Sequence, residues 1–237
     1  MSFLPLLIIS LSFFAESIFG FGGGLIAIPL LSLLMPVKDS VTIVLIFQLL
    51  MGLLIFKIYK LIDWKIALPM TFGLIFGTIF GTYSLASIDD IFLRKFLAIS
   101  IFVFLIKSIF FNKFNLNKIK GKLTGVISGL IGGIFQGIIG TGGPVFTMYL
   151  ADIISQKQVF RATLIYLFFT SSIIRVIASF KTELITKELI SIILPIIPIF
   201  LIALYLGNHI HNKISQKYYD YAIRIILLFS SVSLLLK

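Results

Sequence analysis

The chain has 237 residues, of which 59% are hydrophobic and 12% are charged, and its mean hydropathy is +1.14. Soluble domains carry roughly 25% charged residues, so this composition excludes a soluble protein and predicts an integral membrane protein. The net charge of +11 comes from lysines that stand singly or in short clusters between apolar runs, which is a membrane-topology pattern, and we expect no nucleic-acid partner.

Ten apolar segments follow one another along the chain. Most are close to the roughly 20 residues needed to cross about 30 Å of hydrocarbon. They cover residues 3–19, 25–35, 40–58, 64–86, 91–111, 122–139, 144–155, 158–180, 187–207 and 219–236. The segments 25–35 and 144–155 are about half as long, which is typical of half-helices. The pattern predicts an all-α polytopic membrane protein of about 8 helical segments, with residues 1–237 forming one membrane domain.

Each half-length segment follows a cluster of glycines. The clusters are Gly20-Phe21-Gly22-Gly23-Gly24 and Gly140-Thr141-Gly142-Gly143-Pro144, which lie 120 residues apart. The same offset places Glu16 on Gln136, so a polar side chain precedes each cluster by one helical turn. Several glycines beside a polar residue unwind a helix, and unwound backbone survives at membrane depth only inside protein or along a cavity. Paired breaks of this kind indicate a transporter binding site.

The two clusters predict an internal repeat. A Lys/Asn-rich linker, residues 112–118, separates a first repeat at 1–111 from a second at 119–237. Later landmarks agree at an offset of 126, because Pro69 falls on Pro195 and Gly81 falls on Gly207. The alternative is that hydrophobic sequences align by chance.

The direction of the repeats stays open at this stage. If each break and its half-helix form one bent crossing, the repeats are parallel, and lysine and arginine divide eleven against seven between the two faces. If the half-helix turns back as a re-entrant hairpin, the repeats are inverted and the division is twelve against six. Both schemes place the linker in the cytoplasm.

The expected substrate site lies between the two breaks. Amides at the start of a half-helix carry partial positive charge and attract an anion. The candidate substrate-binding residues are Gly20, Gly22, Gly23, Gly24, Gln136, Gly140, Thr141, Gly142, Gly143 and Arg161. Glu16 is a candidate for proton coupling, because ionisable residues within the membrane are costly. The alternative for Glu16 is a neutral carboxyl that is hydrogen-bonded to the unwound backbone.

Arg161 and Arg175 lie 14 residues apart in one predicted helix and share a face. Arg161 follows the second half-helix closely enough to pair with an anion in a cavity, and a guanidinium suits bidentate recognition of a sulfonate. The competing interpretation makes both arginines interfacial anchors. Gln48 and Tyr166 are weaker cavity candidates.

Two glycine stripes predict close helix packing. Gly121, Gly125, Gly129, Gly133 and Gly137 recur at every fourth position, as do Gly73, Gly77 and Gly81. Such stripes let a neighbouring backbone approach closely. We therefore expect these glycines to be structural.

Three stretches carry a family resemblance: residues 19–29 (FGFGGGLIAIP), residues 137–144 (GIIGTGGP) and residues 160–163 (FRAT). On these motifs the chain resembles the sulfite exporter TauE/SafE family, also called the toluene sulfonate uptake permease family. The resemblance covers nearly the whole chain and implies a multi-pass carrier of the cell (inner) membrane for sulfite, sulfonates or related sulfur-containing organic anions. The family includes both uptake and export.

These observations predict a carrier that works by alternating access, not an enzyme. The expected partners are a small anionic substrate and the lipid bilayer. Assembly into a homo-oligomer is compatible with the sequence. With no cysteine and two histidines in the chain, we expect no metal and no cofactor. The alternatives are an anion or ion channel, or a transporter of non-sulfur carboxylates.

Overall fold

The computed structural model describes residues 3–110 and 121–210, and every element in these ranges is helical. Five helical segments there are long and apolar enough to cross a membrane: Val37–Leu61, Trp64–Ser87, Lys122–Ile139, Lys157–Lys181 and Lys187–Ile210. Many large apolar side chains on these helices are exposed, as expected of a surface that faces lipid. The all-α polytopic membrane fold predicted from the sequence is thus confirmed.

The first part of the chain begins with two helices joined at a glycine cluster. These are α1 (Phe3–Phe19) and α2 (Gly23–Ser32). They are followed by α3 (Val37–Gly52), the short α4 (Ile55–Ile58), a 3-10 turn at Tyr59–Leu61, α5 (Trp64–Ser87) and α6 (Asp90–Phe110). Four of them, α1, α2, α5 and α6, each match a predicted apolar segment to within a few residues, and α3 and α4 together cover the predicted segment 40–58. The interruption after Gly52 was not predicted.

The second part also begins with two helices joined at a glycine cluster. The helices are α7 (Lys122–Ile139), α8 (Gly143–Ala151), α9 (Lys157–Lys181), α10 (Lys187–Ile193) and α11 (Ile197–Ile210), with a 3-10 turn at Leu194–Ile196. Pro195 lies in that turn, where its ring and missing amide disfavour a continuous α-helix. The predicted segment 219–236 and the linker 112–118 lie outside the described residues, and the internal repeat itself stays a prediction.

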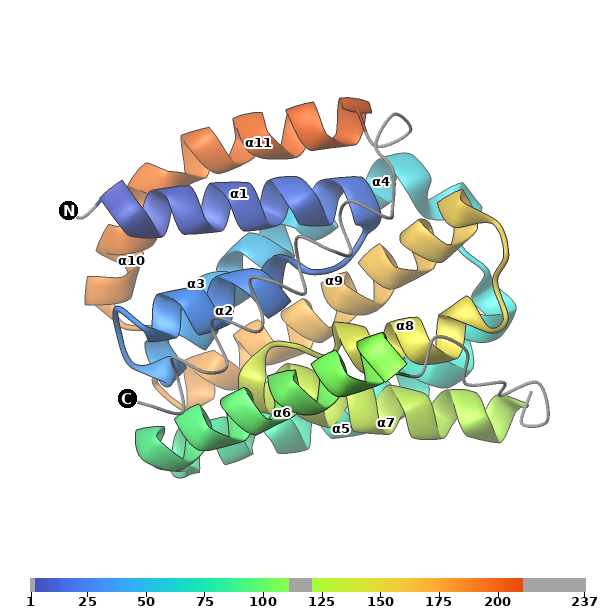
Figure 1. Ribbon diagram of the computed structural model, residues 1–237, viewed down its shortest axis with the longest axis horizontal. Helices are drawn as coiled ribbons and strands as arrows, with labels where there is room; N and C mark the ends of the chain where they lie inside the picture. The colour runs from blue at the N-terminus through green and yellow to red at the C-terminus, as the bar shows by residue number, and fades with distance from the viewer. Residues whose placement is uncertain (1–2, 111–120, 211–237) are drawn as a thin grey trace.

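Both glycine clusters are the tips of helical hairpins. In the second hairpin, Tyr149 near the end of α8 donates a hydrogen bond from its hydroxyl to the carbonyl of Gly121, which precedes α7, over 3.3 Å. The ring of Phe146 lies against Gly132 at the middle of α7. In the first hairpin α2 packs back along α1 (Figure 1). The half-helices therefore turn back, as in the re-entrant scheme, and do not complete a bent crossing.

The two parts of the chain run in opposite directions. In Figure 1, α1 runs away from the end marked N and α7 runs toward it, and the pairs α3 with α9 and α5 with α11 are opposed in the same way. The hairpins consequently enter from opposite ends of the molecule. This arrangement corresponds to the inverted scheme.

The glycine stripes of α5 and α7 face each other. A Cβ atom added at Gly133 would lie 2.7 Å from the carbonyl oxygen of Leu74, and one added at Gly137 would lie 2.7 Å from the Cα atom of Gly81. Similar overlaps with backbone atoms would occur at Gly73, Gly77 and Gly129. The predicted backbone approach is confirmed for these glycines with two exceptions: a Cβ atom at Gly125 would meet the side chains of Tyr149 and Pro69, and one at Gly121 would meet only Thr124 Oγ1, at 3.9 Å.

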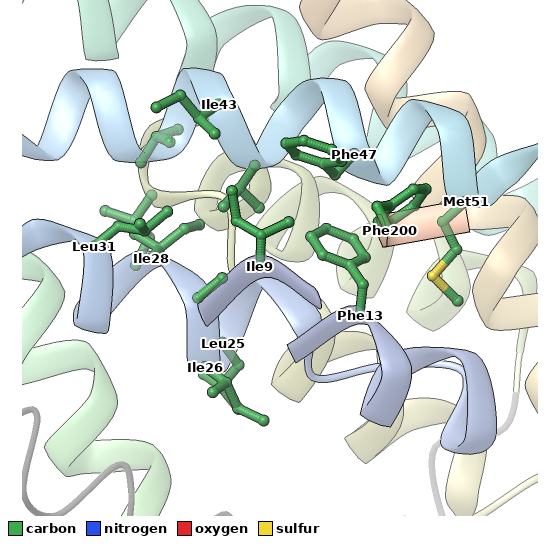
Figure 2. Packing of buried hydrophobic residues seen from close by; sticks show 14 of the residues in the cluster. Ile9, Phe13, Leu25, Ile26, Ile28, Leu31, Ile43, Phe47, Met51 and Phe200 are labelled. Atoms are coloured by element: carbon green, nitrogen blue, oxygen red, sulfur yellow. The ribbon is translucent and has the colours of Figure 1, made fainter. Parts of the chain in front are cut away.

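A similar close contact, again at a glycine, joins α11 to α1. Gly207 on α11 lies directly against Ser17 on α1, so α11 packs on the first hairpin as α5 packs on the second. Beside this contact, the rings of Phe13, Phe47 and Phe200 come from α1, α3 and α11 and pack with centroid separations of 5.0–6.0 Å (Figure 2). Apolar packing therefore holds both hairpins inside the protein.

Candidate functional site

Glycine ends the first helix of each hairpin in the same way. The amide of Gly20 donates to the carbonyl of Glu16 over 2.7 Å, and the amide of Gly140 donates to the carbonyl of Gln136 over 3.0 Å. Gly20 has φ 84° and Gly140 has φ 65°, which is left-handed backbone that glycine adopts without strain. Glu16 and Gln136 therefore occupy equivalent places in the last turns of α1 and α7.

Each half-helix begins at an N-cap glycine, which offers no capping side chain of its own. Gly22 and Gly142 are the N-cap residues of α2 and α8, and neither has a side chain to satisfy the first amides. All glycines of both clusters are buried. Two helix N-termini, each with partial positive charge, thus begin deep in the protein.

The tips of the two hairpins touch. A Cβ atom added at Gly24 would lie 2.6 Å from the carbonyl oxygen of Gly140, and one added at Gly140 would lie 2.5 Å from Ile28 on α2. Only residues without a side chain allow this approach, so the sequence of both clusters is required for the contact.

A small pocket lies where the tips meet. The space open to the centre of a water molecule is about 10 Å³, which is room for about one water. Residues from both hairpins and from α3 and α9 line it: Glu16, Phe21, Gly22, Gly24, Leu25, Gln48, Gly140, Thr141, Gly143, Pro144 and Phe168. The pocket must widen before it can hold a polyatomic anion.

Two polar side chains at the pocket have unused hydrogen-bonding capacity. The Oε2 atom of Glu16 and the Oγ1 atom of Thr141 are buried and have no hydrogen-bond partner within residues 3–110 and 121–210. Both residues are only 2% exposed. Leaving such groups unpaired costs about 1 to 3 kcal/mol each, so a polar ligand in the pocket would recover stability.

The Glu16 carboxyl also interacts with the start of α2, because it accepts hydrogen bonds from the amides of Gly23 and Gly24. In the second hairpin the corresponding group is the Oε1 atom of Gln136, which accepts from the amide of Gly142 over 2.7 Å. The two hairpins thus place an acid and an amide at matching positions.

Gln48 on α3 connects the second hairpin to α9. Its Oε1 atom accepts one hydrogen bond from the Nε2 atom of Gln136 over 2.9 Å and another from the Nη1 atom of Arg175 over 3.2 Å. Arg175 also donates to the carbonyl of Val41 over 3.4 Å. All three side chains are buried, which makes Gln48 a central part of the site.

Arg161 lies outside the pocket. Its guanidinium donates twice to the carbonyl of Ser17, over 3.1 and 2.5 Å, and once to the side chain of Asn208 over 2.9 Å. Its Cγ atom would be 2.8 Å from a Cβ atom at Gly20. Arg161 therefore joins α9 to α1 and α11. Because Arg161 and Arg175 are 6% and 1% exposed, the interpretation of both as interfacial anchors is wrong.

The structure brings some of the candidate residues to the pocket and not others. Those that line it are Glu16, Gly22, Gly24, Gly140, Thr141 and Gly143, whereas Gly20, Gly23, Gln136, Gly142 and Arg161 stand behind it or shape the hairpins. Sequence reasoning gave little weight to Gln48 and missed the apolar walls Phe21, Leu25 and Phe168. A polar residue at the centre of a long apolar segment was the available signal for Gln48.

Comparison with protein families finds a match over nearly the whole chain. The family model described as Sulfite exporter TauE/SafE matches residues 5–234, which is nearly the whole chain. Neither the comparison with curated proteins nor the comparison with solved structures found a match.

Proposed function

The chain belongs to the sulfite exporter TauE/SafE family of membrane transporters of sulfur-containing anions, and from this premise we propose that it carries sulfite, a sulfonate or a related small anion by alternating access. The anion binds where the tips of the two hairpins meet. The protein is multi-pass, and we propose the cell (inner) membrane as its location.

The observation that carries this proposal is the meeting of two helix N-termini at one buried pocket. Amides at helix N-termini attract anions, and here the starts of α2 and α8 converge from opposite ends of the molecule. Thr141 has a free hydroxyl there, and the guanidinium of Arg175 lies behind Gln48. These groups suit a compact oxyanion.

The small size of the pocket favours a carrier over a channel. With room for about one water, the pocket as it stands is too narrow for a file of hydrated ions to pass. Opposed hairpins give a simple route for alternating access, because movement of one hairpin would open the pocket toward one end of the molecule.

Transport in proteoliposomes tests the proposal. Labelled sulfite, methanesulfonate and acetate would be offered to the purified full-length protein, and counterflow would be measured with each. We expect saturable transport and counterflow of sulfite or methanesulfonate. Non-saturable flux without counterflow would indicate a channel, and transport of acetate alone would indicate a carboxylate carrier.

Substitution of Thr141 ties the transport to the pocket. Thr141→Val removes the free hydroxyl at similar volume, so we expect the KM for the transported anion to rise about 10-fold, the loss of one hydrogen bond to a charged group. The matched control is Thr147→Val on the same half-helix, because the Thr147 hydroxyl donates only to the carbonyl of Pro144. If Thr141→Val and Thr147→Val have equal KM values, the anion does not bind at the Thr141 hydroxyl.

A further inference from the structure

We propose that the side-chain NH2 group of Gln48 binds the transported anion directly, and that Arg175 and Gln136 are positioning residues that hold this NH2 group toward the pocket. The inference rests on the proposed function, since it names a ligand of the same site. It assigns a binding role to α3, a helix outside both hairpins.

The hydrogen bonds of the Gln48 amide fix its orientation. An amide oxygen has two lone pairs, and Gln136 and Arg175 use both at the Oε1 atom. The Nε2 atom therefore points the other way. It lies 2.8 Å from where a Cβ atom at Gly24 would be, beside the contact of the two hairpin tips, and Gln48 lines the pocket.

The orientation is transmitted from the second hairpin. The amide of Gly142 donates to the Oε1 atom of Gln136, which leaves the Nε2 atom of Gln136 as the donor toward Gln48. Donation thus runs in one direction, from Gly142 through Gln136 and Gln48 toward the pocket. Each group in such a chain polarises the next, which strengthens the last donor.

Arg175 adds positive charge behind this donor. It is 1% exposed, and within residues 3–110 and 121–210 the observed salt bridge joins Arg94 and Asp90, not Arg175 and a carboxylate. The partners of Arg175 are the neutral oxygens of Gln48 and Val41. By donating to the Oε1 atom of Gln48, the guanidinium polarises the Gln48 amide, which makes its NH2 group a stronger donor to the anion.

Arg175 also prevents the opposite orientation of the amide. If the Gln48 side chain were flipped, its NH2 group would face the guanidinium and its oxygen would face the anion, and both contacts would be repulsive. The guanidinium therefore selects the orientation that binds anions. Arg175 acts through Gln48, so its contribution disappears when Gln48 is absent.

Counterflow of methanesulfonate or sulfite in proteoliposomes tests the inference, with KM and maximal rate determined separately. We expect Gln48→Leu and Arg175→Met each to raise KM about 10- to 100-fold, the loss expected for a hydrogen bond to a charged group. Arg175→Lys keeps a cationic donor and should restore most of the affinity. The control is Gln158→Leu, an exposed position on α9, which should leave KM unchanged.

The double variant Gln48→Leu/Arg175→Met separates positioning from direct binding. We expect its KM to equal that of Gln48→Leu alone, because Arg175 works through the amide. If the effects of the two single substitutions on KM multiply in the double variant, Arg175 does not act through Gln48. An unchanged KM in Gln48→Leu would overturn the inference. If the Gln48→Leu variant does not insert into the membrane, Gln48→Asn replaces it. Asparagine keeps the amide but is too short to reach the anion, so we expect the same rise in KM.

Failure of the proposed function gives a different result. If the unsubstituted protein transports none of the sulfur anions, the proposed function itself fails. If the protein transports them with a KM that none of these substitutions changes, the function stands and the role of Gln48 is refuted.

Discussion

Glu16 and a bound anion would place two negative charges in one pocket. The Glu16 carboxyl lines the pocket and is bonded to the amides at the start of α2, the same groups that would attract the anion. Two like charges about 4 Å apart repel by roughly 4 kcal/mol at an effective dielectric constant of about 20. Protonation of Glu16 removes this repulsion, so we infer that a proton accompanies the anion.

The first prediction concerns Glu16→Gln. Glutamine has similar volume and cannot ionise, so we expect the pH dependence of net flux to flatten while anion exchange without a gradient continues. Flux at several pH values and exchange at equal concentrations would be measured in proteoliposomes. Glu188→Gln, an exposed position on α10, is the control and should keep the pH dependence of the unsubstituted protein. Loss of both net flux and exchange would show that the negative charge itself is required.

For some polar residues the sequence predicts the position in the site, and for others it does not. Glu16 and Gln136 were predictable, because each stands one turn before a glycine cluster at a common offset. Arg161 and Arg175 were not, since a helical sequence gives their shared face but not their partners. The carbonyl of Ser17 and the amide of Gln48 come from helices more than 120 positions away, and no local pattern reports such contacts.

At the scale of elements, the contact of α5 and α7 depends on backbone approach. Gly129 lies so close to the carbonyl of Met70 that an added Cβ atom would overlap it, and the two helices would have to separate. Overpacking of this kind costs about 1 to 3 kcal/mol. The four-residue period predicted this contact face, while the choice of α5 as the partner of α7 required the structure.

The second prediction compares alanine substitutions at two positions of one stripe, Gly129 at its middle and Gly121 at its end. We expect Gly129→Ala to lower the stability of the purified protein by about 1 to 3 kcal/mol, measured by thermal unfolding in detergent. Gly121→Ala should change it much less, because a Cβ atom there meets nothing closer than Thr124 Oγ1 at 3.9 Å. Equal loss in both variants would mean that the backbone contact with Met70 does not set the effect.

At the scale of the whole molecule, the turn-back of each half-helix decides the topology. Segment lengths alone allowed parallel or inverted parts, because a half-helix of about ten residues can continue a crossing or reverse it. The contact of Tyr149 with Gly121 shows reversal in the second hairpin. The connection between α8 and α9 therefore lies at the same end of the molecule as the start of α7, and the connection between α5 and α6 lies at the other end (Figure 1).

The third prediction uses the absence of cysteine from the chain. Ser155→Cys, between α8 and α9, and Ser87→Cys, at the last residue of α5, introduce single thiols at exposed positions on these two ends. We expect a membrane-impermeant thiol reagent to label them from opposite faces, with Ser155→Cys labelled from the cytoplasm, the side expected for the lysine-rich linker. The parallel scheme would give labelling of both positions from the same face.

The contacts of Ser17 have a consequence for biosynthesis. Ser17 belongs to α1, which is synthesised before the other described helices, but it is held by Arg161, 144 positions later, and by Gly207 on α11. Contacts at such separation form late, since the intervening chain must be made first. We therefore expect the first hairpin to remain incompletely packed in the bilayer until α11 has been synthesised, so that a chain stalled before α11 would expose this hairpin to membrane quality control.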